Sequence, residues 1–370
     1  MQSLTDKTLA FRDRLLGNPA FHKWAAKTPF VRRFAHREAR AAFDLCAGFV
    51  YSQILYACVS LGILDLLRQG PQDLRAIAQH AGLPVDRTHR LLLAAVSLRL
   101  LENRGENRFG LGMLGAAMAA NPGIAKMIEH HRMFYDDLRD PVALLRGDGA
   151  ASGLSSYWPY ATDDVPGSLN DQDIAGYTQL MSASQALVAS EILDAYPVAR
   201  HRCLMDVGGG DGAFLSAVAK RAPDLALMLF DLPAVAARAN QRLATEGYAS
   251  RTSVFGGNFR ADALPAGADL ISLVRIVHDH NDSVVMKLFS TIREALPAGG
   301  TLLVAEPMSE TRGAEPVGDA YFGFYLMAMG TGRPRTAAEI MGMMTAAGFS
   351  KARAIKTRMP LQSSLVIATS

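Results

Sequence analysis

Short apolar runs alternate with longer helical patterns in the second half of the chain. The runs are rich in Leu, Val and Met. Strands in a parallel sheet have this appearance because helices cover both faces of the sheet. The pattern therefore predicts an α/β, doubly wound domain. The expected strands are Cys203–Val207, Ala226–Phe230, Thr252–Phe255, Asp269–Val274 and Thr301–Ala305, with Lys351–Lys356 and Ser364–Thr369 closing the chain.

The first half has a helical pattern instead. Over Ala41–Ala120 the apolar positions recur at helical spacing, with breaks at Gly70-Pro71 and Gly82-Leu83-Pro84. A turn-rich stretch over 103–107 follows, so the segment predicts three short helices and a small hairpin, the arrangement of a winged helix. Such a unit can bind DNA, but the helix expected over Asp86–Leu100 is too apolar to face phosphates. We therefore expect it to contact a protein partner.

Two domains are expected from the length of 370 residues and the 49% hydrophobic content. Residues 141–170 are rich in Gly, Ser, Asp and Pro and carry Tyr157, Trp158 and Tyr160, which predicts a loop or lid. A long helix is expected over Asp173–Ala195. The predicted organisation is basic amphipathic helices over 1–40, a mostly α winged-helix domain with its lid over 41–170, and the α/β domain over 171–370.

The formal net charge of +3 is small, which argues against a surface devoted to nucleic acid. The charge is uneven, because residues 1–40 hold nine Lys or Arg and three acids, a net +6, which leaves −3 for the rest. Cys46, Cys58 and Cys203 lie in apolar surroundings without metal-ligand spacing, so we expect reduced core residues and no metal site. No stretch reaches the roughly 20 apolar residues that span a bilayer, which predicts a cytoplasmic protein.

A glycine-rich turn, Asp206–Ala213, joins the first expected strand of the second half to a helix. Glycines at this position allow a tight turn and let a ligand approach backbone amides. The turn also satisfies the dinucleotide pattern at Gly208, Gly210 and Ala213, so a nicotinamide-dependent oxidoreductase stays as an alternative, as does a turn without a ligand. Asp231 ends the next strand, where a carboxylate can accept both hydroxyls of an adenosine ribose.

The third and fourth strands end in further candidate residues. Gly257, Asn258 and Phe259 offer a side-chain amide and a ring, which suit the edge and face of an adenine. The fourth strand leads to Arg275 and then to His278, so an imidazole emerges at the carboxyl edge of the sheet, as a proton acceptor requires. A histidine that only caps the strand end is the alternative.

These motifs resemble, in the same order, those of the small-molecule O-methyltransferases that include caffeic acid and acetylserotonin methyltransferases. The similar stretches are Asp206–Gly212, Phe230–Pro233, Gly257–Phe259, Arg275–Asp279 and Glu306-Pro307. The resemblance covers most of the chain and implies an N-terminal winged-helix dimerisation domain, a C-terminal methyltransferase fold, S-adenosyl-L-methionine as methyl donor and a homodimer. By position it implies a donor site made of Gly208, Asp231, Gly257, Asn258, Phe259 and Arg275.

The resemblance also implies how the proton is removed. His278 is then the general base, Glu306 braces it, and Asp279 helps to orient the acceptor. A carboxylate on the far ring nitrogen would fix the tautomer and stabilise the imidazolium that forms on proton transfer.

Three positions depart from the family pattern. Asn258 stands where the family usually has Asp, and His280 stands where it has Trp. Within Arg333–Thr336, Pro334 replaces a second carboxylate that braces the base. We therefore expect the strength of the base, and the acceptor, to differ from those of other members.

The acceptor is expected to be apolar. Tyr321–Met329 and Tyr177–Met181 bring rings and thioethers that suit a hydrophobic ligand, although each residue alone also fits an ordinary core. Within the family, Phe11–Leu16, Phe43–Gln53 and Gly153–Tyr160 resemble bacterial carotenoid O-methyltransferases, which implies the tertiary 1-hydroxyl of a carotenoid as acceptor. A phenol and a ring carbon of a bacteriochlorophyllide stay as alternatives.

The basic arm over 1–40 fits an acceptor that dissolves in membrane. Its cations are interleaved with apolar residues such as Phe11, Trp24 and Phe30, so they can rest on anionic lipid while the apolar faces dip in or clasp a dimer partner. This predicts a cytoplasmic enzyme with peripheral contact to the inner or photosynthetic membrane. A non-catalytic DNA-binding regulator, the last alternative, would bind duplex in a salt-sensitive manner and transfer no methyl group.

Overall fold

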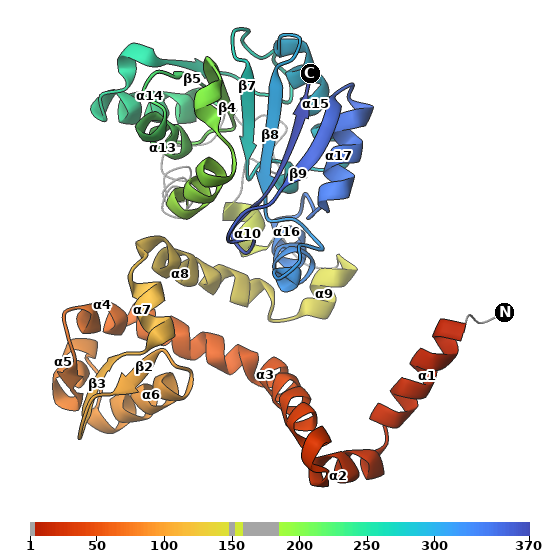
Figure 1. Ribbon diagram of the computed structural model, residues 1–370. Coiled ribbons are helices and arrows are strands. Elements are labelled where there is room, and N and C mark those ends of the chain that lie inside the picture. The colour runs from red at the N-terminus through yellow and green to blue at the C-terminus, as the bar shows by residue number, and fades with distance from the viewer. Residues whose placement is uncertain (1–3, 148–151, 158–184) are drawn as a thin grey trace. The chain divides into compact units, whose positions relative to one another are not determined.

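The computed structural model describes residues 4–147, 152–157 and 185–370, and its contacts divide the chain into two units, Met1–Ala120 and Asn121–Ser370 (Figure 1). The boundary expected between residues 40 and 41 lies inside helix α3 (Pro29–Ser60). The helix continues through this point because residues 38–42 are Glu, Ala and Arg, all strong helix formers. The change in charge there is therefore not a change in secondary structure.

The first unit contains the expected three short helices and hairpin. α5 begins at Asp73, whose carboxylate accepts bonds from the amides of Arg75 and Ala76, and ends at Gly82, which has a left-handed φ of 64°. Leu92 of α6 is fully buried in the core of the unit. The elements are α4 (Ile63–Arg68), β1 (Gln72–Asp73), α5 (Leu74–Ala81), α6 (Val85–Ser97), β2 (Leu101–Asn103), β3 (Arg108–Leu111) and α7 (Met113–Ala119), with sheet order β1-β3-β2.

Helices α1 (Leu4–Leu16), α2 (Pro19–Lys27) and α3 leave large apolar side chains exposed; Phe30 is 95% exposed and Leu45 86%. Among the described residues, α3 is the one helix long and apolar enough to cross a bilayer by length and composition. This corrects the expectation that no stretch qualifies, because a window of mean hydropathy 1.4 tolerates interspersed polar residues. A helix that buries its apolar surface against a protein partner can have the same length and mean hydropathy.

A seven-stranded sheet forms the centre of the second unit, in the order β6-β5-β4-β7-β8-β10-β9. β4 to β8 are parallel, and β10 is antiparallel to both β8 and β9. Every expected strand is present, within one residue of its expected bounds. The strands are β4 (Cys203–Val207), β5 (Ala226–Asp231), β6 (Thr252–Gly256), β7 (Leu270–Val274), β8 (Thr301–Glu306), β9 (Ser350–Ile355) and β10 (Ser364–Thr369).

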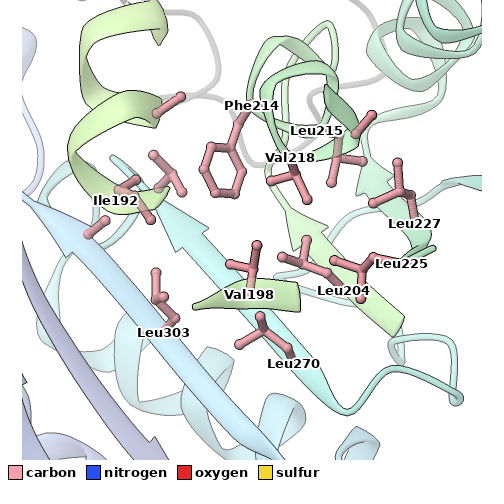
Figure 2. Close-up of a cluster of buried hydrophobic side chains, with 14 of the residues drawn as sticks. Ile192, Val198, Leu204, Phe214, Leu215, Val218, Leu225, Leu227, Leu270 and Leu303 are labelled. Atoms are coloured by element: carbon pink, nitrogen blue, oxygen red, sulfur yellow. The ribbon is translucent and has the colours of Figure 1, made fainter. Parts of the chain in front are cut away.

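Helices cover both faces of this sheet, which confirms the doubly wound fold (Figure 1). Figure 2 shows Phe214 and Val218 of α13 facing Leu204 and Leu270 of the sheet, while the next residue along β4, Met205, belongs to the core on the other face. The first core is covered by a helix over 185–195, α13 (Ala213–Arg221) and α14 (Pro233–Thr245); the second is covered by α15 (Asp282–Ala295) and α17 (Ala337–Ala346).

The region expected as a loop or lid differs in its described part. It contains two short helices, α9 (Pro141–Arg146) and α10 (Gly153–Tyr157). Asp137, at the end of α8 (Pro122–Asp137), accepts bonds from the amides of Gly153 and Leu154, and Leu154 is fully buried. These contacts give a Gly- and Ser-rich segment enough support to form a helix. Trp158, Tyr160, Tyr177–Met181 and the first part of the helix expected over 173–195 lie outside the described residues.

Candidate active site

The residues expected to bind the donor follow four neighbouring strands. β6, β5, β4 and β7 lie side by side and parallel, so their carboxyl ends meet at one edge of the sheet. The glycine turn follows β4, Asp231 ends β5, Gly257–Phe259 follow β6, and Arg275 follows β7. The structure brings all of them to this edge. We call Gly208–Gly212 together with these residues the donor edge.

The glycine turn has a backbone that other residues adopt only with strain. Gly208, Gly210 and Gly212 have φ angles of 72°, 59° and 81°. At Gly208 space is also missing, because an added Cβ would lie 2.5 Å from Cδ1 of Ile276. α13 begins directly after Gly212, and its first amide, that of Ala213, donates to Oδ1 of Asp211 at 3.2 Å. The start of the helix lies next to the turn, where its dipole favours a polar or negative ligand group.

Asp231 is bonded to this turn. The amide of Gly210 donates to its Oδ2 at 2.8 Å, and the amide of Leu232 donates to its Oδ1 at 2.7 Å. Burial raises the pKa of Asp231 to about 6, although the two backbone bonds oppose the rise. Each carboxylate oxygen has a further lone pair, so Asp231 can accept bonds from a diol while it holds the turn.

Gly257, Asn258 and Phe259 lie beside Asp231. The amide of Gly257 donates to the carbonyl of Asp231 at 2.9 Å, and the side-chain oxygen of Asn258 accepts a bond from the amide of Arg260 at 2.9 Å. The ring of Phe259 meets His280 edge-on at 5.3 Å between centroids. Burial lowers the pKa of His280 to about 4, so this histidine presents a neutral ring next to the expected adenine site.

Arg275 turns the chain from β7 toward the candidate base. Its φ of 60° is left-handed, which is uncommon for a residue with a side chain and costs energy. The amide of Arg275 donates to the carbonyl of Ala305 at 2.9 Å, so pairing with the end of β8 supports the bend. Strain of this kind concentrates at functional sites, which agrees with the position of Arg275 on the donor edge.

His278 lies between two carboxylates in η4 (Val277–Asp279). Its Nδ1 contacts Glu306, and its Nε2 lies 2.9 Å from Oδ1 of Asp279. Glu306 ends β8, and its Oε1 accepts bonds from the amides of Ile276 at 2.9 Å and Val277 at 2.6 Å. The structure thus brings together the three residues expected to act in proton transfer, all buried. Glu306 holds both the ring and the backbone turn that carries it.

The two carboxylates decide the charge of the ring. Burial alone would lower the pKa of His278, but Glu306 and Asp279 outweigh it and raise the pKa to about 10. The charges of the two carboxylates are the larger cause of the rise, and hydrogen bonding to them adds to it. A base with a raised pKa holds a proton more strongly, which suits a weakly acidic acceptor, but only the neutral fraction of the ring can accept the proton. That fraction is small at neutral pH and grows as pH rises toward 10.

The sequence analysis missed the role of Arg335. Its buried guanidinium donates to the carbonyls of Val277 at 2.7 Å and His280 at 2.8 Å and pairs with Asp282. It therefore holds both ends of the turn that carries His278. The sequence showed an arginine beside Pro334, but no sequence signal indicates that its partners lie more than 50 residues away. Pro334 has no carboxylate to offer to His278. The carboxylate next to Nε2 of His278 is that of Asp279.

Four rings form what we call the aromatic wall: Phe134 of α8, Tyr321 and Phe322 of the π-helix η5 (Val317–Phe322), and Tyr325 of α16 (Gly323–Met329). The ring of Phe322 lies 5.4 Å from that of His278. Tyr321 meets Phe322 edge-on at 5.0 Å and stacks on Tyr325 at 5.9 Å, and Phe134 packs edge-on against both tyrosines. The expected acceptor-lining segment thus supplies three of the rings, and Phe134 was not anticipated.

Two family models match the chain. The model of the O-methyltransferase domain matches residues 135–350, and the model of the O-methyltransferase dimerisation domain matches residues 43–121. The first match decides between the methyl donor and the nicotinamide alternative. The second agrees with the exposed apolar side chains of α3 and supports a homodimer.

Curated relatives extend over almost the whole chain. Demethylspheroidene O-methyltransferase of Cereibacter sphaeroides is 46% identical over 96% of this chain and 93% of its own length. The protein of that name from Rhodobacter capsulatus is 39% identical over 97% of this chain and 89% of its own length. Acetylserotonin O-methyltransferase of Mus musculus is 29% identical, over 88% and 87%.

Solved structures agree with the fold. Human N-acetylserotonin methyltransferase in complex with SAM has a TM-score of 0.74 at 24% identity, over 90% of this chain and 97% of that one. CalO1, a methyltransferase of calicheamicin biosynthesis in its SAH-bound form, has a TM-score of 0.74 at 26% identity, over 90% and 98%. Both the fold and the type of cofactor are therefore shared with solved methyltransferases.

Proposed function

Because the chain belongs to the S-adenosylmethionine-dependent O-methyltransferase family, we propose that it methylates the tertiary 1-hydroxyl of a carotenoid of the demethylspheroidene type, with His278 as general base. The observation that supports this choice of acceptor is the 46% identity to a demethylspheroidene O-methyltransferase over 96% of the chain. Relatives named for other acceptors, such as acetylserotonin, are less similar at 29%. The enzyme would thus act in carotenoid biosynthesis.

The donor edge fits S-adenosylmethionine in its chemistry. Asp231 would accept bonds from the ribose hydroxyls, Asn258 and Phe259 would contact the adenine, and Gly208 and Arg275 would line the rest of the donor. The spare lone pairs of Asp231 and the left-handed backbone of Gly208, Gly210 and Gly212 support this fit. When bound, the donor supplies a methyl group on a positively charged sulfur, which leaves as a neutral thioether.

Nε2 of His278 would take the proton of the acceptor hydroxyl. A tertiary alcohol is a much weaker acid than a phenol, so the proton must leave while the bond between the alcohol oxygen and the methyl carbon forms and the carbon–sulfur bond breaks. The resulting imidazolium lies between Glu306 and Asp279, whose charges stabilise it. Asp279, 2.9 Å from Nε2, would also steer the hydroxyl toward this nitrogen.

Label transfer tests this proposal. The purified protein is incubated with radiolabelled S-adenosylmethionine and a detergent-dispersed 1-hydroxycarotenoid, a phenol or a bacteriochlorophyllide, and label is counted in each extracted product. We expect label in the carotenoid, as a methyl ether. Label only in the phenol or the tetrapyrrole would keep the methyltransferase activity and reject the proposed acceptor.

We further propose that the arm over 1–40 contacts an anionic membrane surface. α1 and α2 precede the matched dimerisation domain, which begins at residue 43. Phe11 is 62% exposed and Trp24 54%, and the segment carries a net +6. Exposed rings among cations are typical of helices that lie in the lipid interface, where anionic lipid adds to the binding of apolar side chains.

Vesicle flotation tests this contact. The protein should float with vesicles that contain phosphatidylserine and remain below with phosphatidylcholine alone. Arg32→Gln with Arg33→Gln should weaken flotation through charge, and Phe11→Ser with Trp24→Ser should weaken it at unchanged charge. Equal flotation with both lipids, or a change of mass from dimer to monomer in these variants, would instead assign the arm to another role.

A further inference from the structure

Two histidine–tyrosine pairs join α8 to the aromatic wall. Nε2 of His130 lies 2.7 Å from the hydroxyl of Tyr325, and Nε2 of His131 lies 2.6 Å from the hydroxyl of Tyr321. The histidines are consecutive on α8, whereas the tyrosines lie one helical turn apart on η5 and α16. The proposed proton transfer uses none of these four side chains.

His130, His131 and Tyr321 are uncharged at physiological pH. Burial lowers the pKa of His130 to about 4, lowers the pKa of His131 and raises the pKa of Tyr321 to about 12. The pairs therefore act as hydrogen bonds between uncharged rings, and they satisfy polar atoms that would be costly to bury alone. A wall of phenylalanine and leucine would fill the same space. What the bonds add is a fixed orientation of the tyrosine rings.

The bond to His131 determines which surface Tyr321 presents. With its hydroxyl bonded to α8, the ring lies nearly parallel to Tyr325, at 21°, and nearly perpendicular to Phe322, at 87°. Tyr321 and Phe322 are partly exposed, whereas Tyr325 is buried. Tyr321 and Phe322 therefore form the accessible part of the wall. Phe322 lies beside His278, and the hydroxyl of Tyr321 is bonded to His131.

A chain of hydrogen bonds connects the wall to the base. The hydroxyl of Ser309 donates to Asp319 of η5 at 2.8 Å, and its amide donates to the carbonyl of Arg335 at 3.0 Å. Arg335 in turn bonds the carbonyls of Val277 and His280, on either side of the base. These bonds link η5, which carries Tyr321, to the turn that carries His278. A π-helix often marks such a functional position.

We propose that Tyr321, held by His131, is a specificity-determining residue that binds the conjugated part of the acceptor. The inference rests on the proposed function, because that acceptor carries its hydroxyl on a conjugated chain. A π-system gains from contact with an aromatic ring beyond the area it buries, whereas a saturated chain gains only from burial. His131 acts through Tyr321 and is a positioning residue.

The test compares two acceptors that carry the same tertiary alcohol, one on a conjugated polyene and one on a saturated chain of equal length. Tyr321→Leu should raise KM for the conjugated acceptor by about tenfold, with kcat and the KM of the saturated acceptor changed less than about twofold. Tyr321→Phe and His131→Leu should each raise the conjugated KM by about threefold. The double variant, Tyr321→Phe with His131→Leu, should raise the conjugated KM no further than either single variant, because both changes remove the same hydrogen bond.

Tyr248→Leu makes the same exchange at a half-buried tyrosine beside Arg251, away from the wall, and serves as the control for losing a tyrosine. Donor affinity measured by calorimetry confirms that each variant is folded; if Tyr321→Leu fails this check, the Tyr321→Phe and His131→Leu results decide. Equal changes of KM for both acceptors, or no change, would overturn the inference alone. Transfer to neither alcohol by the unaltered enzyme would overturn the proposed function, and this inference with it.

Discussion

The donor edge and the aromatic wall meet near His278 but are built in opposite ways. The donor edge consists of turns that directly follow parallel strands, and its bonds are made largely by backbone, such as the amides of Gly210 and Gly257 on Asp231. The wall consists of side-chain rings from α8, η5 and α16, held by bonds between side chains such as His131 and Tyr321. In the proposed function, the topology of the sheet therefore fixes recognition of the donor, whereas recognition of the acceptor depends on a few exchangeable side chains.

The largest expected effect concerns the residue where the two regions meet. His278→Ala should lower kcat about 10²-fold or more, the usual contribution of a general base. Donor affinity should change less than about twofold, because the ring contacts Glu306, Asp279 and Phe322 rather than the donor edge. Initial rates and calorimetry measure the two quantities. His201→Ala, at the opposite end of the sheet, is the matched control, and unchanged turnover in His278→Ala would refute the assigned role.

A smaller loss is expected when the charge behind the base is removed. Glu306→Gln keeps an oxygen for the amides of Ile276 and Val277 but removes the negative charge beside Nδ1, and kcat on the high-pH plateau should fall roughly 10- to 100-fold. The base works only when neutral, so the rate rises with pH through its pKa. Since the paired carboxylates raise this pKa to about 10, the unaltered enzyme should lose activity as pH falls through the alkaline range.

The pH dependence separates a charge effect from a structural one. In Glu306→Gln the rising limb of kcat should move to lower pH by about one unit or more, because an attractive charge is gone. If kcat rises over the same pH range in both proteins but reaches a lower plateau in the variant, Glu306 only holds the backbone of the turn that carries His278.

The donor edge should respond in donor affinity alone. Asp231→Asn leaves one oxygen to serve the amides of Gly210 and Leu232 as well as the ribose, so the dissociation constant for S-adenosylmethionine should rise about tenfold. With saturating donor, kcat and the KM of the acceptor should remain within about twofold. A rise in acceptor KM as large as the loss of donor affinity would mean that the two regions are not independent.

The same difference explains what could be predicted from the sequence. Strands such as Leu270–Val274 were located within one residue because a strand buried on both faces is a short, predominantly apolar run. The helix over 153–157 was missed because its support comes from Asp137, not from its own composition. The boundary drawn at residue 40 followed a change of charge, while helix propensity continued through it.

In the site, local motifs were predicted and distant contacts were not. Asp231 and Arg275 could be placed at one edge of the sheet because Asp231 ends a strand, Arg275 directly follows one, and parallel strands share that edge. Arg335 and His131 could not be assigned, because their partners lie 53 to 190 residues away and pairing depends on how helices pack. The sequence pattern predicts which helices and strands form, but it does not predict which side chains of different elements are in contact.

The smallest expected effect concerns side chains of the donor edge other than that of Asp231, and tests whether they contribute to donor binding. Arg242 of α14 lies 2.6 Å from Oδ2 of Asp211 in the glycine turn, and its side chain is 34% exposed, so solvent screens the pair. Arg242→Met should weaken donor binding only about two- to threefold, and less at high salt, with kcat unchanged. Calorimetry at two salt concentrations measures this. A tenfold loss would show that the turn depends on side-chain charge, and the division between a backbone-built donor edge and a side-chain-built wall would not hold.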